Sequence, residues 1–248
     1  MNRVKLIIEY DGSNYVGWQK QKNGKSIQQE IESCLEKLFD ETIPIYVSGR
    51  TDAGVHAFGQ VAHFDINNPG IEISKIYSAL NYLLKKSDNQ IVILRSDKVS
   101  SLFDSRFSVK KKTYLYRIFN RTTPSSIFKN RVWFIPQKLN IEKMKQSSKV
   151  LIGNYDFSAF RSINCQAKNP QRSIKDIKIQ KKKNLIEIRV IGKSFMHNQV
   201  RIIVGTLINS GLERWDKKEV KKILNSKDRK NAGPTAPAHG LYLEKIMY

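Results

Sequence analysis

The sequence predicts an α+β fold of two similar halves, whose strands would form one extended, mixed and mainly antiparallel sheet with a cleft between the halves. The chain has 248 residues, of which 40% are hydrophobic, so it can bury a sizeable core and is too apolar to be disordered. The order helix, strand, glycine- or serine-containing loop, strand, helix occurs once in each half. We expect the halves to be residues 1–105 and 106–248, with a ligand site in the cleft where they join.

The first half alternates strands with amphipathic helices. A helix is predicted to begin after Ser26, because Gln29 completes a capping box and apolar residues then recur at helical spacing. A second amphipathic helix is predicted over residues 74–84. The strands are predicted from β-branched content and alternation, and they are residues 4–10, 43–47, 60–64 and 91–99.

The second half begins with an aromatic and β-branched strand over residues 112–119. Residues 174–180 and 185–191 alternate in polarity, and three lysines lie between them at a predicted hairpin tip, where lysine discourages pairing with another sheet edge. The predicted helices are residues 141–151 and 200–210, and residues 240–247 are predicted to be a closing strand.

The charge of the chain indicates a polyanionic partner. Lys and Arg number 44 against 22 Asp and Glu, which gives a formal net charge of +22. Such a surface attracts nucleic acid, with a strong dependence on salt. A membrane is the other polyanionic surface, but no stretch approaches the roughly 18 apolar residues of a spanning helix. The first residues lack a signal-peptide profile, so we expect a cytoplasmic protein without a membrane partner.

The cysteines and histidines predict no disulfide framework and no metal. Cys34 lies among the apolar residues of the first predicted helix, where a buried thiol acts as a small core residue. Together with Cys165 it cannot form a disulfide framework or a structural zinc site. The four histidines lack the short paired spacings of metal ligands.

The segment SGRTDAGVHA, residues 48–57, is the most unusual in the sequence. Gly49 and Gly54 permit backbone angles that would hold the Asp52 carboxylate out of a loop between two strands. The neighbouring Arg50 would favour the ionised, nucleophilic form of that carboxylate. The alternative is a plain turn in which Asp52 bonds its own backbone.

Two other kinds of site are excluded in this segment. Ser48, Asp52 and His56 could suggest a serine hydrolase, but the nucleophile elbow G-x-S-x-G is absent. One Asp and one His leave a metal ligand set incomplete.

The decapeptide resembles the catalytic motif of the TruA-type tRNA pseudouridine synthase family. Further matches run nearly end to end in the order of that family, which makes the resemblance highly specific. The other matching residues are Tyr10-Asp11-Gly12, Tyr15, Gly17, Trp18, Gln19, Phe103, Arg106-Phe107, Tyr114, Tyr116, Phe157 to Arg161, Phe195-Met196-His197, Val200-Arg201, Thr235 to Ala238 and Gly240 to Leu243.

The resemblance implies the pseudouridine synthase fold, with helices on one side of the sheet, and an isomerisation that consumes no cofactor. Asp52 corresponds to the family's nucleophile, and Tyr114 to the tyrosine that stacks on the extruded uracil. Arg201 corresponds to an arginine that would hold Asp52 ionised and oriented. Arg50 would contact RNA, either by filling the space that the flipped base leaves or by binding phosphate.

Two of these assignments have simpler alternatives. Tyr114 could be a strand aromatic that faces the core. Arg201 could be a surface or phosphate-binding arginine, although its apolar neighbours argue for a buried anionic partner.

The resemblance also implies the substrate and the assembly. The substrate would be the anticodon stem-loop of tRNA, with uridines at tRNA positions 38, 39 and 40 converted, and the working form would be a homodimer. Recognition would rest on RNA shape and backbone charge. Candidate phosphate contacts are the lysines of 110–112, 181–183 and 217–222. The alternatives are a non-catalytic RNA-binding protein of the same fold and a pseudouridine synthase that acts on another RNA.

The chain departs from the family pattern at four positions, none of which carries the proposed chemistry. Asp104 and Ser105 stand where His and Ala are expected. Thr113 replaces a basic residue, and Gln199 replaces an apolar one. These departures concern the details of the tRNA contact.

Overall fold

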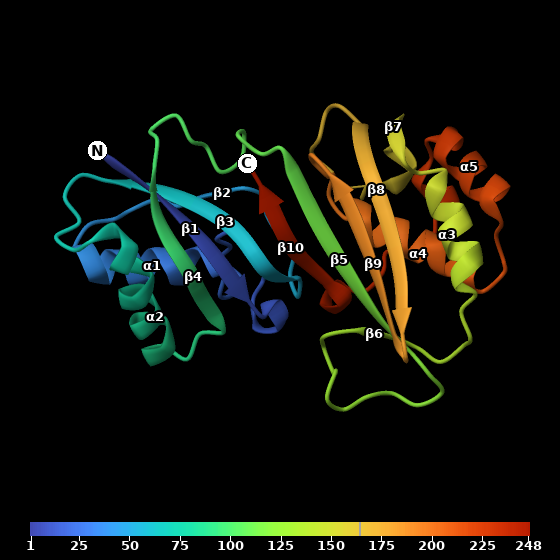
Figure 1. The fold of residues 1–248 in the computed structure, drawn as a ribbon, viewed down its shortest axis with the longest axis horizontal. Helices are drawn as coiled ribbons and strands as arrows, with labels where there is room; N and C mark the ends of the chain where they lie inside the picture. The colour runs from blue at the N-terminus through green and yellow to red at the C-terminus, as the bar shows by residue number, and fades with distance from the viewer. Residues whose placement is uncertain (164) are drawn as a thin grey trace. The chain divides into compact units, whose positions relative to one another are not determined.

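The computed structural model describes residues 1–163 and 165–248, which pack into two compact units. Unit 1 comprises residues 1–110 and 242–248, and unit 2 comprises residues 111–241. Helices and mainly antiparallel strands occur in both (Figure 1), so the predicted α+β class is confirmed. The division of the chain at residue 105 stays a prediction.

The strands of unit 1 are arranged around β1 (Asn2–Tyr10), which pairs antiparallel with both β3 (His56–Ile66) and β4 (Ile91–Val99). The short strand β2 (Tyr46–Val47) pairs antiparallel with β3, and β10 (Leu241–Met247) pairs with β3 in parallel. The prediction of a strand at the end of the chain is thus confirmed by β10. Its partner β3 directly follows the loop that contains Asp52.

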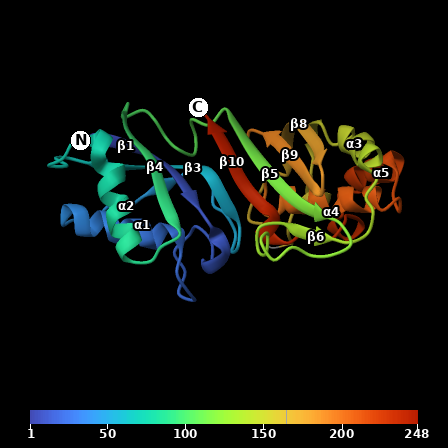
Figure 2. The same ribbon diagram turned by 60° about the horizontal axis from the view of Figure 1, so that its bottom comes forward.

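The helices of unit 1 cover the buried side of these strands. Helix α1 (Ile27–Phe39) begins where predicted, because the Ser26 hydroxyl accepts the N–H of Gln29 at 3.2 Å. Helix α2 (Ile76–Lys86) lies beside α1 (Figure 2). Cys34 of α1 is buried in the core between helices and strands, as predicted.

The strand predicted over residues 43–47 is shorter than expected. Only the last two residues pair with β3. Pro44 has no N–H to donate to a ladder, and the N–H of Ile45 donates to the Glu32 carboxylate of α1 at 3.0 Å. Ile43 and Ile45 are nevertheless buried, so the segment contributes to the core without being a strand.

The strands of unit 2 form an antiparallel series. Strand β9 (Leu185–Gly192) pairs with β5 (Lys111–Asn120) and with β8 (Gln171–Lys182), and β8 pairs with β7 (Gly153–Asp156). The predicted hairpin between β8 and β9 is confirmed. An additional strand of three residues, β6 (Trp133–Ile135), pairs in parallel with β5.

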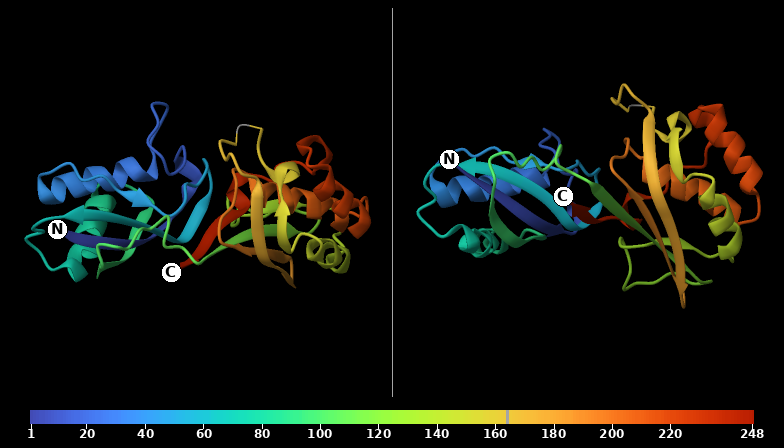
Figure 3. Two further views of the ribbon diagram at one scale, coloured as in Figure 1. Left: turned by 90° about the horizontal axis from the view of Figure 1, so that it is seen from above. Right: turned by 45° about the horizontal axis from the view of Figure 1, so that its top comes forward.

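Three helices of unit 2 lie together on one side of β8 (Figures 1 and 3). They are α3 (Ile141–Lys149), α4 (Gln199–Gly211) and α5 (Lys217–Ser226). Helix α4 is buried along most of its length, as its apolar sequence predicts. Helix α5 carries the lysines of the third basic cluster. Within the described ranges, no helix is long and apolar enough to cross a membrane.

Candidate active site

Asp52 lies on the loop of residues 48–55, which connects β2 to β3 in unit 1. Backbone groups at the start of this loop form hydrogen bonds with β3. The N–H of Ser48 donates to the carbonyl of Val61 at 2.9 Å, and the side-chain amide of Gln60 donates to the carbonyl of Gly49 at 2.8 Å. Because Gln60 is fully buried on β3, the sheet fixes the start of the loop.

Tyr10, the last residue of β1, forms hydrogen bonds that hold the loop. Its hydroxyl shares a hydrogen bond of 2.8 Å with the hydroxyl of Thr51 and accepts one from Gln60 at 3.3 Å. Burial raises the pKa of Tyr10 to about 12, so the hydroxyl keeps its proton at neutral pH. The residue adjacent to Asp52 is therefore held by a buried polar network.

The segment after Tyr10 closes over the same loop. The N–H of Trp18 donates to the carbonyl of Thr51 at 3.0 Å, and Gly17 forms an antiparallel bridge with Asp52. A Cβ on Gly17, whose φ is +109°, would lie 2.7 Å from the Thr51 carbonyl oxygen, and one on Gly12 would lie 2.1 Å from that of Val55. These two positions accept only glycine because the backbones approach so closely.

His56 links the end of the loop to the same amino-terminal segment. Its Nδ1 lies 3.1 Å from the backbone nitrogen of Gly12 and 3.0 Å from a carboxylate oxygen of Asp11. The ring stacks on Tyr242 with centroids 4.7 Å apart. His56 thus holds β3 against the Tyr10-Asp11-Gly12 turn, and it has a structural role in this loop.

Asp52 and Arg50 differ in their exposure to solvent and in their contacts. Asp52 is half-buried, and its backbone carbonyl accepts the N–H of Val55 at 3.1 Å across a turn in which Gly54 has a φ of +76°. Arg50 is exposed, and it forms no ion pair or side-chain hydrogen bond with any other residue in the described ranges. The loop thus presents a fixed Asp beside an exposed, available Arg.

Arg201 lies in unit 2, in the first half of α4. Its guanidinium is fixed at two points, since Nε donates to the carbonyl of Ala236 at 2.7 Å and Nη1 donates to the side-chain oxygen of Asn198 at 2.8 Å. Asn198 caps the helix with a φ of +61°, and the N–H of Ala236 returns a hydrogen bond to the carbonyl of Arg201 at 3.2 Å. The arginine is therefore ordered before any ligand arrives.

Tyr114 lies on β5, also in unit 2, and it is only half-buried. The ring of Phe195 meets it edge to face, with centroids 5.2 Å apart, so a second aromatic ring sets its orientation. The neighbouring Tyr116 is fully buried, and its hydroxyl donates to the carbonyl of Pro237 at 2.7 Å. Of the two tyrosines, Tyr116 has the core role, and Tyr114 is the one that is partly exposed.

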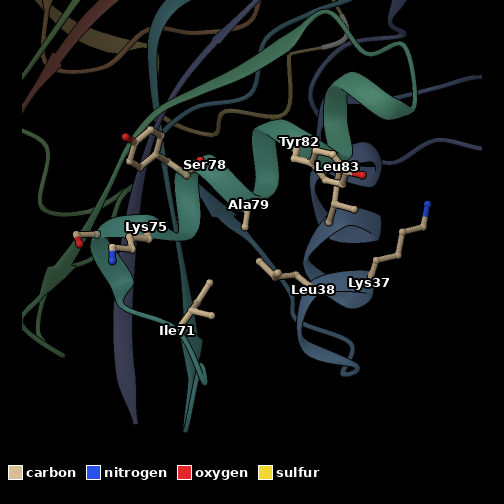
Figure 4. A pocket seen from close by; sticks show the side chains of 10 residues that line it. Lys37, Leu38, Ile71, Lys75, Ser78, Ala79, Tyr82 and Leu83 are labelled. Carbon is tan, nitrogen blue, oxygen red and sulfur yellow. The ribbon is translucent and has the colours of Figure 1, made fainter.

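A groove of unit 1 lies apart from this loop. It has a volume of about 630 Å³ and lies between α1 and α2 (Figure 4). Its lining includes Leu38, Ala79 and Tyr82 but no carboxylate, His or Cys, so it lacks the kind of group that Asp52 provides in the loop. In the described ranges, no group of three or more potential metal ligands occurs.

The sequence did not assign a role to the residues that support the Asp52 loop. Tyr10, Gly12, Gly17 and Trp18 stood out only as an amino-terminal motif. The signal that could have indicated their role is the pair of glycines, since both lie close to large aromatic residues in a short segment that precedes a capped helix.

Comparison with known proteins shows the family of the chain. A family model described as tRNA pseudouridine synthase matches residues 6–108 and 148–248. A protein named tRNA pseudouridine synthase A from Ehrlichia chaffeensis is 47% identical over 247 residues, which is 99% of this chain and 100% of that protein. Proteins of the same name from Wolbachia pipientis and Bartonella tribocorum are 47% and 43% identical, with at least 99% of this chain and 100% of each protein covered.

Proposed function

We propose that this chain, which belongs to the tRNA pseudouridine synthase family, isomerises uridine to pseudouridine in tRNA with Asp52 as the nucleophile. The observation that carries the proposal is the loop of residues 48–55, in which Asp52 is half-buried between glycines and braced by Tyr10, Thr51 and Gln60. A carboxylate that performs covalent catalysis needs such a fixed position.

The reaction breaks the bond between the ribose C1′ and the uracil N1 and forms a bond between C1′ and C5. The proton of C5 is lost to solvent and N1 gains one, so the product is an isomer and no oxidant or reductant is consumed. Asp52 attacks the sugar or the base and is released unchanged. One carboxylate and a pocket that holds the detached base are sufficient for this chemistry.

Arg201 and Tyr114 have proposed roles as well. Arg201 is already fixed by Ala236 and Asn198, and we assign it to hold the Asp52 carboxylate ionised and oriented. The accessible ring of Tyr114, oriented by Phe195, would stack on the extruded uracil. Arg50, exposed beside the nucleophile, would contact the RNA.

The proposed substrate is the anticodon stem-loop, with uridines 38, 39 and 40 as the reacting nucleotides. The net charge of +22 supports a polyanionic substrate, and relatives that are alike along their whole length carry tRNA in their names. The proposed working form is a homodimer in the cytoplasm. A non-catalytic RNA-binding role is less well supported, because Asp52, Tyr114 and Arg201 are all present.

Tritium release tests the reaction and the nucleophile. The protein is incubated with tRNA whose uridines carry tritium at C5, and radioactivity in the solvent is followed over time. We expect release by the wild type and none above background by Asp52→Asn, with equal tRNA binding by both proteins. Equal release by both would refute the assignment of Asp52. Mapping the modified nucleotides in tRNA, ribosomal RNA and messenger RNA then decides between the possible substrates.

A further inference from the structure

The connection between β4 and β5 contains a motif that the proposed chemistry does not use. Phe103, Arg106 and Phe107 belong to the central motif of the sequence, but only the first of them is packed against the protein. Phe107 is 78% exposed, and Arg106 is exposed beside it. A large aromatic ring that is left in water within such a motif indicates a contact with another molecule.

This connection is firmly attached to unit 1. The ring of Phe103 lies edge-on to His63 and 4.8 Å from the ring of Tyr248. The guanidinium of Arg3 donates to the carbonyls of Ser101 and Phe103 at 2.7 and 2.8 Å. Exposure of the neighbouring residues is therefore not the result of a loose loop.

Ser105 forms the second attachment. It is fully buried, and its hydroxyl donates to the carbonyl of Tyr46 at 2.7 Å and lies 3.0 Å from Nδ1 of His63. Its own carbonyl accepts a hydrogen bond from the Tyr248 hydroxyl at 2.7 Å. The residue directly before Arg106 thus has a single, well-defined position.

Asp104 shapes the turn that presents the exposed pair. One of its carboxylate oxygens accepts the N–H groups of Arg106 and Phe107 at 2.7 and 2.8 Å. Its own N–H donates to the hydroxyl of Ser108 at 3.0 Å, and its carbonyl accepts the N–H of Ser108 at 3.0 Å. The departure from the family pattern at this position therefore supplies a compact turn.

The two side chains at the tip of this turn suit a nucleotide. The guanidinium of Arg106 lies 5.4 Å from the centre of the Phe107 ring, and in the described ranges no carboxylate pairs with it. A cation without an acidic partner attracts phosphate, and an exposed aromatic face stacks on an unpaired base. A purely apolar partner would leave the Arg106 charge desolvated without compensation.

We propose that Arg106 and Phe107 form a stacking platform for one unpaired nucleotide of the RNA substrate. Phe107 would stack on the base, and Arg106 would bind the adjacent phosphate. This inference rests on the proposed function for the identity of the ligand as RNA. It concerns substrate binding and not the chemical step.

Binding measurements with matched variants test the platform. The Kd for an unmodified tRNA transcript is measured by filter binding at one fixed salt concentration. We expect Phe107→Ala to raise the Kd about tenfold, the typical effect of removing one stacking partner, and Phe107→Trp to restore it. The control is Tyr82→Ala, which removes another aromatic side chain, 69% exposed on α2, and should leave the Kd unchanged. Arg106→Ala should lower the slope of log Kd against log salt by about one.

A spectroscopic measurement keeps the test independent of variant stability. The added tryptophan of Phe107→Trp should lose fluorescence on titration with tRNA, when the signal of the wild-type protein is subtracted. An unchanged Kd for Phe107→Ala, or no quenching of the new tryptophan, would overturn the platform. A change in oligomeric mass of Phe107→Ala without tRNA would also overturn it, because the ring would then be a protein contact.

The platform and the proposed function can fail separately. Absence of tritium release by the wild type, with tenfold weaker tRNA binding by Phe107→Ala, would refute the reaction and retain the platform. Tritium release by the wild type, with unchanged tRNA binding by Phe107→Ala, would support the reaction and refute the platform.

Discussion

The hydroxyls of Tyr10 and Thr51 share a hydrogen bond of 2.8 Å although the two residues are 41 positions apart in the sequence. Thr51 directly precedes the proposed nucleophile, and Tyr10 ends the central strand of unit 1. The bond therefore connects the end of a strand that is paired on both sides to the backbone beside Asp52. It also brings the amino-terminal motif into contact with the SGRTDAGVHA motif.

Removal of this hydroxyl should loosen the loop without removing any group that reacts. Tyr10→Phe leaves the Thr51 hydroxyl and the Gln60 amide with one partner fewer, so we expect the free energy of unfolding to fall by about 1 kcal/mol. Because catalysis depends steeply on position, kcat should fall about tenfold while the Kd for tRNA stays the same. Urea denaturation, tritium release and filter binding measure the three quantities. Tyr82→Phe, on an exposed tyrosine, is the control, and equal kcat for both variants would contradict the coupling.

The close approach at Gly12 predicts a large effect from a single methyl group. A Cβ at this position would lie 2.1 Å from the Val55 carbonyl oxygen, so Gly12→Ala should displace the end of the Asp52 loop. We expect a loss of stability of about 3 kcal/mol, at the upper end of the cost of overpacking, together with loss of most tritium release.

Gly70→Ala serves as the matched control for that substitution. Gly70 has a φ of +65°, but a Cβ there would meet no atom within 4 Å. It therefore reports the backbone strain alone, of about 1 kcal/mol, without a steric clash. Similar melting temperatures of Gly12→Ala and Gly70→Ala would show that the approach of Gly12 to Val55 is unimportant.

Much of the fold could be predicted because its signals are local. The Ser26 cap lies three residues from its partner, and the hairpin between β8 and β9 is marked by the lysines at its tip. The short strand β2 was overestimated because an N–H that could have joined the ladder donates to Glu32 of a helix instead. The parallel pairing of β6 with β5 was missed, since three residues carry too little pattern.

The candidate site was predictable in its reactive residue but not in its support. Asp52 stood out because glycines flank it within a short loop. The roles of Tyr10, Gly12 and Trp18 depend on contacts between segments that are far apart in the sequence. No periodicity or composition encodes such contacts, and only the folded backbone brings the segments together.

The geometry of Arg201 predicts that lysine cannot replace it. Lys keeps the positive charge, but it cannot donate from Nε and Nη1 to Ala236 and Asn198 in the fixed planar arrangement of the guanidinium. We expect Arg201→Lys to lower kcat about 100-fold, with little change in the Kd for tRNA.

The control for this variant comes from the same part of unit 2. Arg229 donates to the carbonyl of Ala232 at 3.3 Å and to the hydroxyl of Thr235 at 3.2 Å. Arg229→Lys should keep kcat within about twofold, because these longer bonds serve only the segment that follows α5. A wild-type kcat for Arg201→Lys would refute a role of its guanidinium in orienting the nucleophile.

His63 predicts how stability depends on pH. Burial of His63, and next the nearby charge of Arg3, lower the pKa of the imidazole below its ordinary value. The unfolded chain therefore binds a proton at this residue below about pH 6.5, whereas the folded chain does so only at a lower pH. Protons thus favour the unfolded state, and the stability contributed by neutral His63 is complete above about pH 6.5 and declines as the pH falls.

The measurement compares wild type with His63→Gln in urea at several pH values. Gln has no titrating group and retains polar atoms that can face Ser105. Both proteins contain the other three histidines, so the contribution of these histidines cancels in the difference. Between pH 7.5 and pH 5.5 the wild type should lose more of its free energy of unfolding than the variant does, because the pKa of His63 is lowered in the folded state. Parallel pH profiles for the two proteins would show that His63 is protonated equally in both states. The expected divergence would show that His63, which lies 3.0 Å from the Ser105 hydroxyl, is held neutral in the folded state.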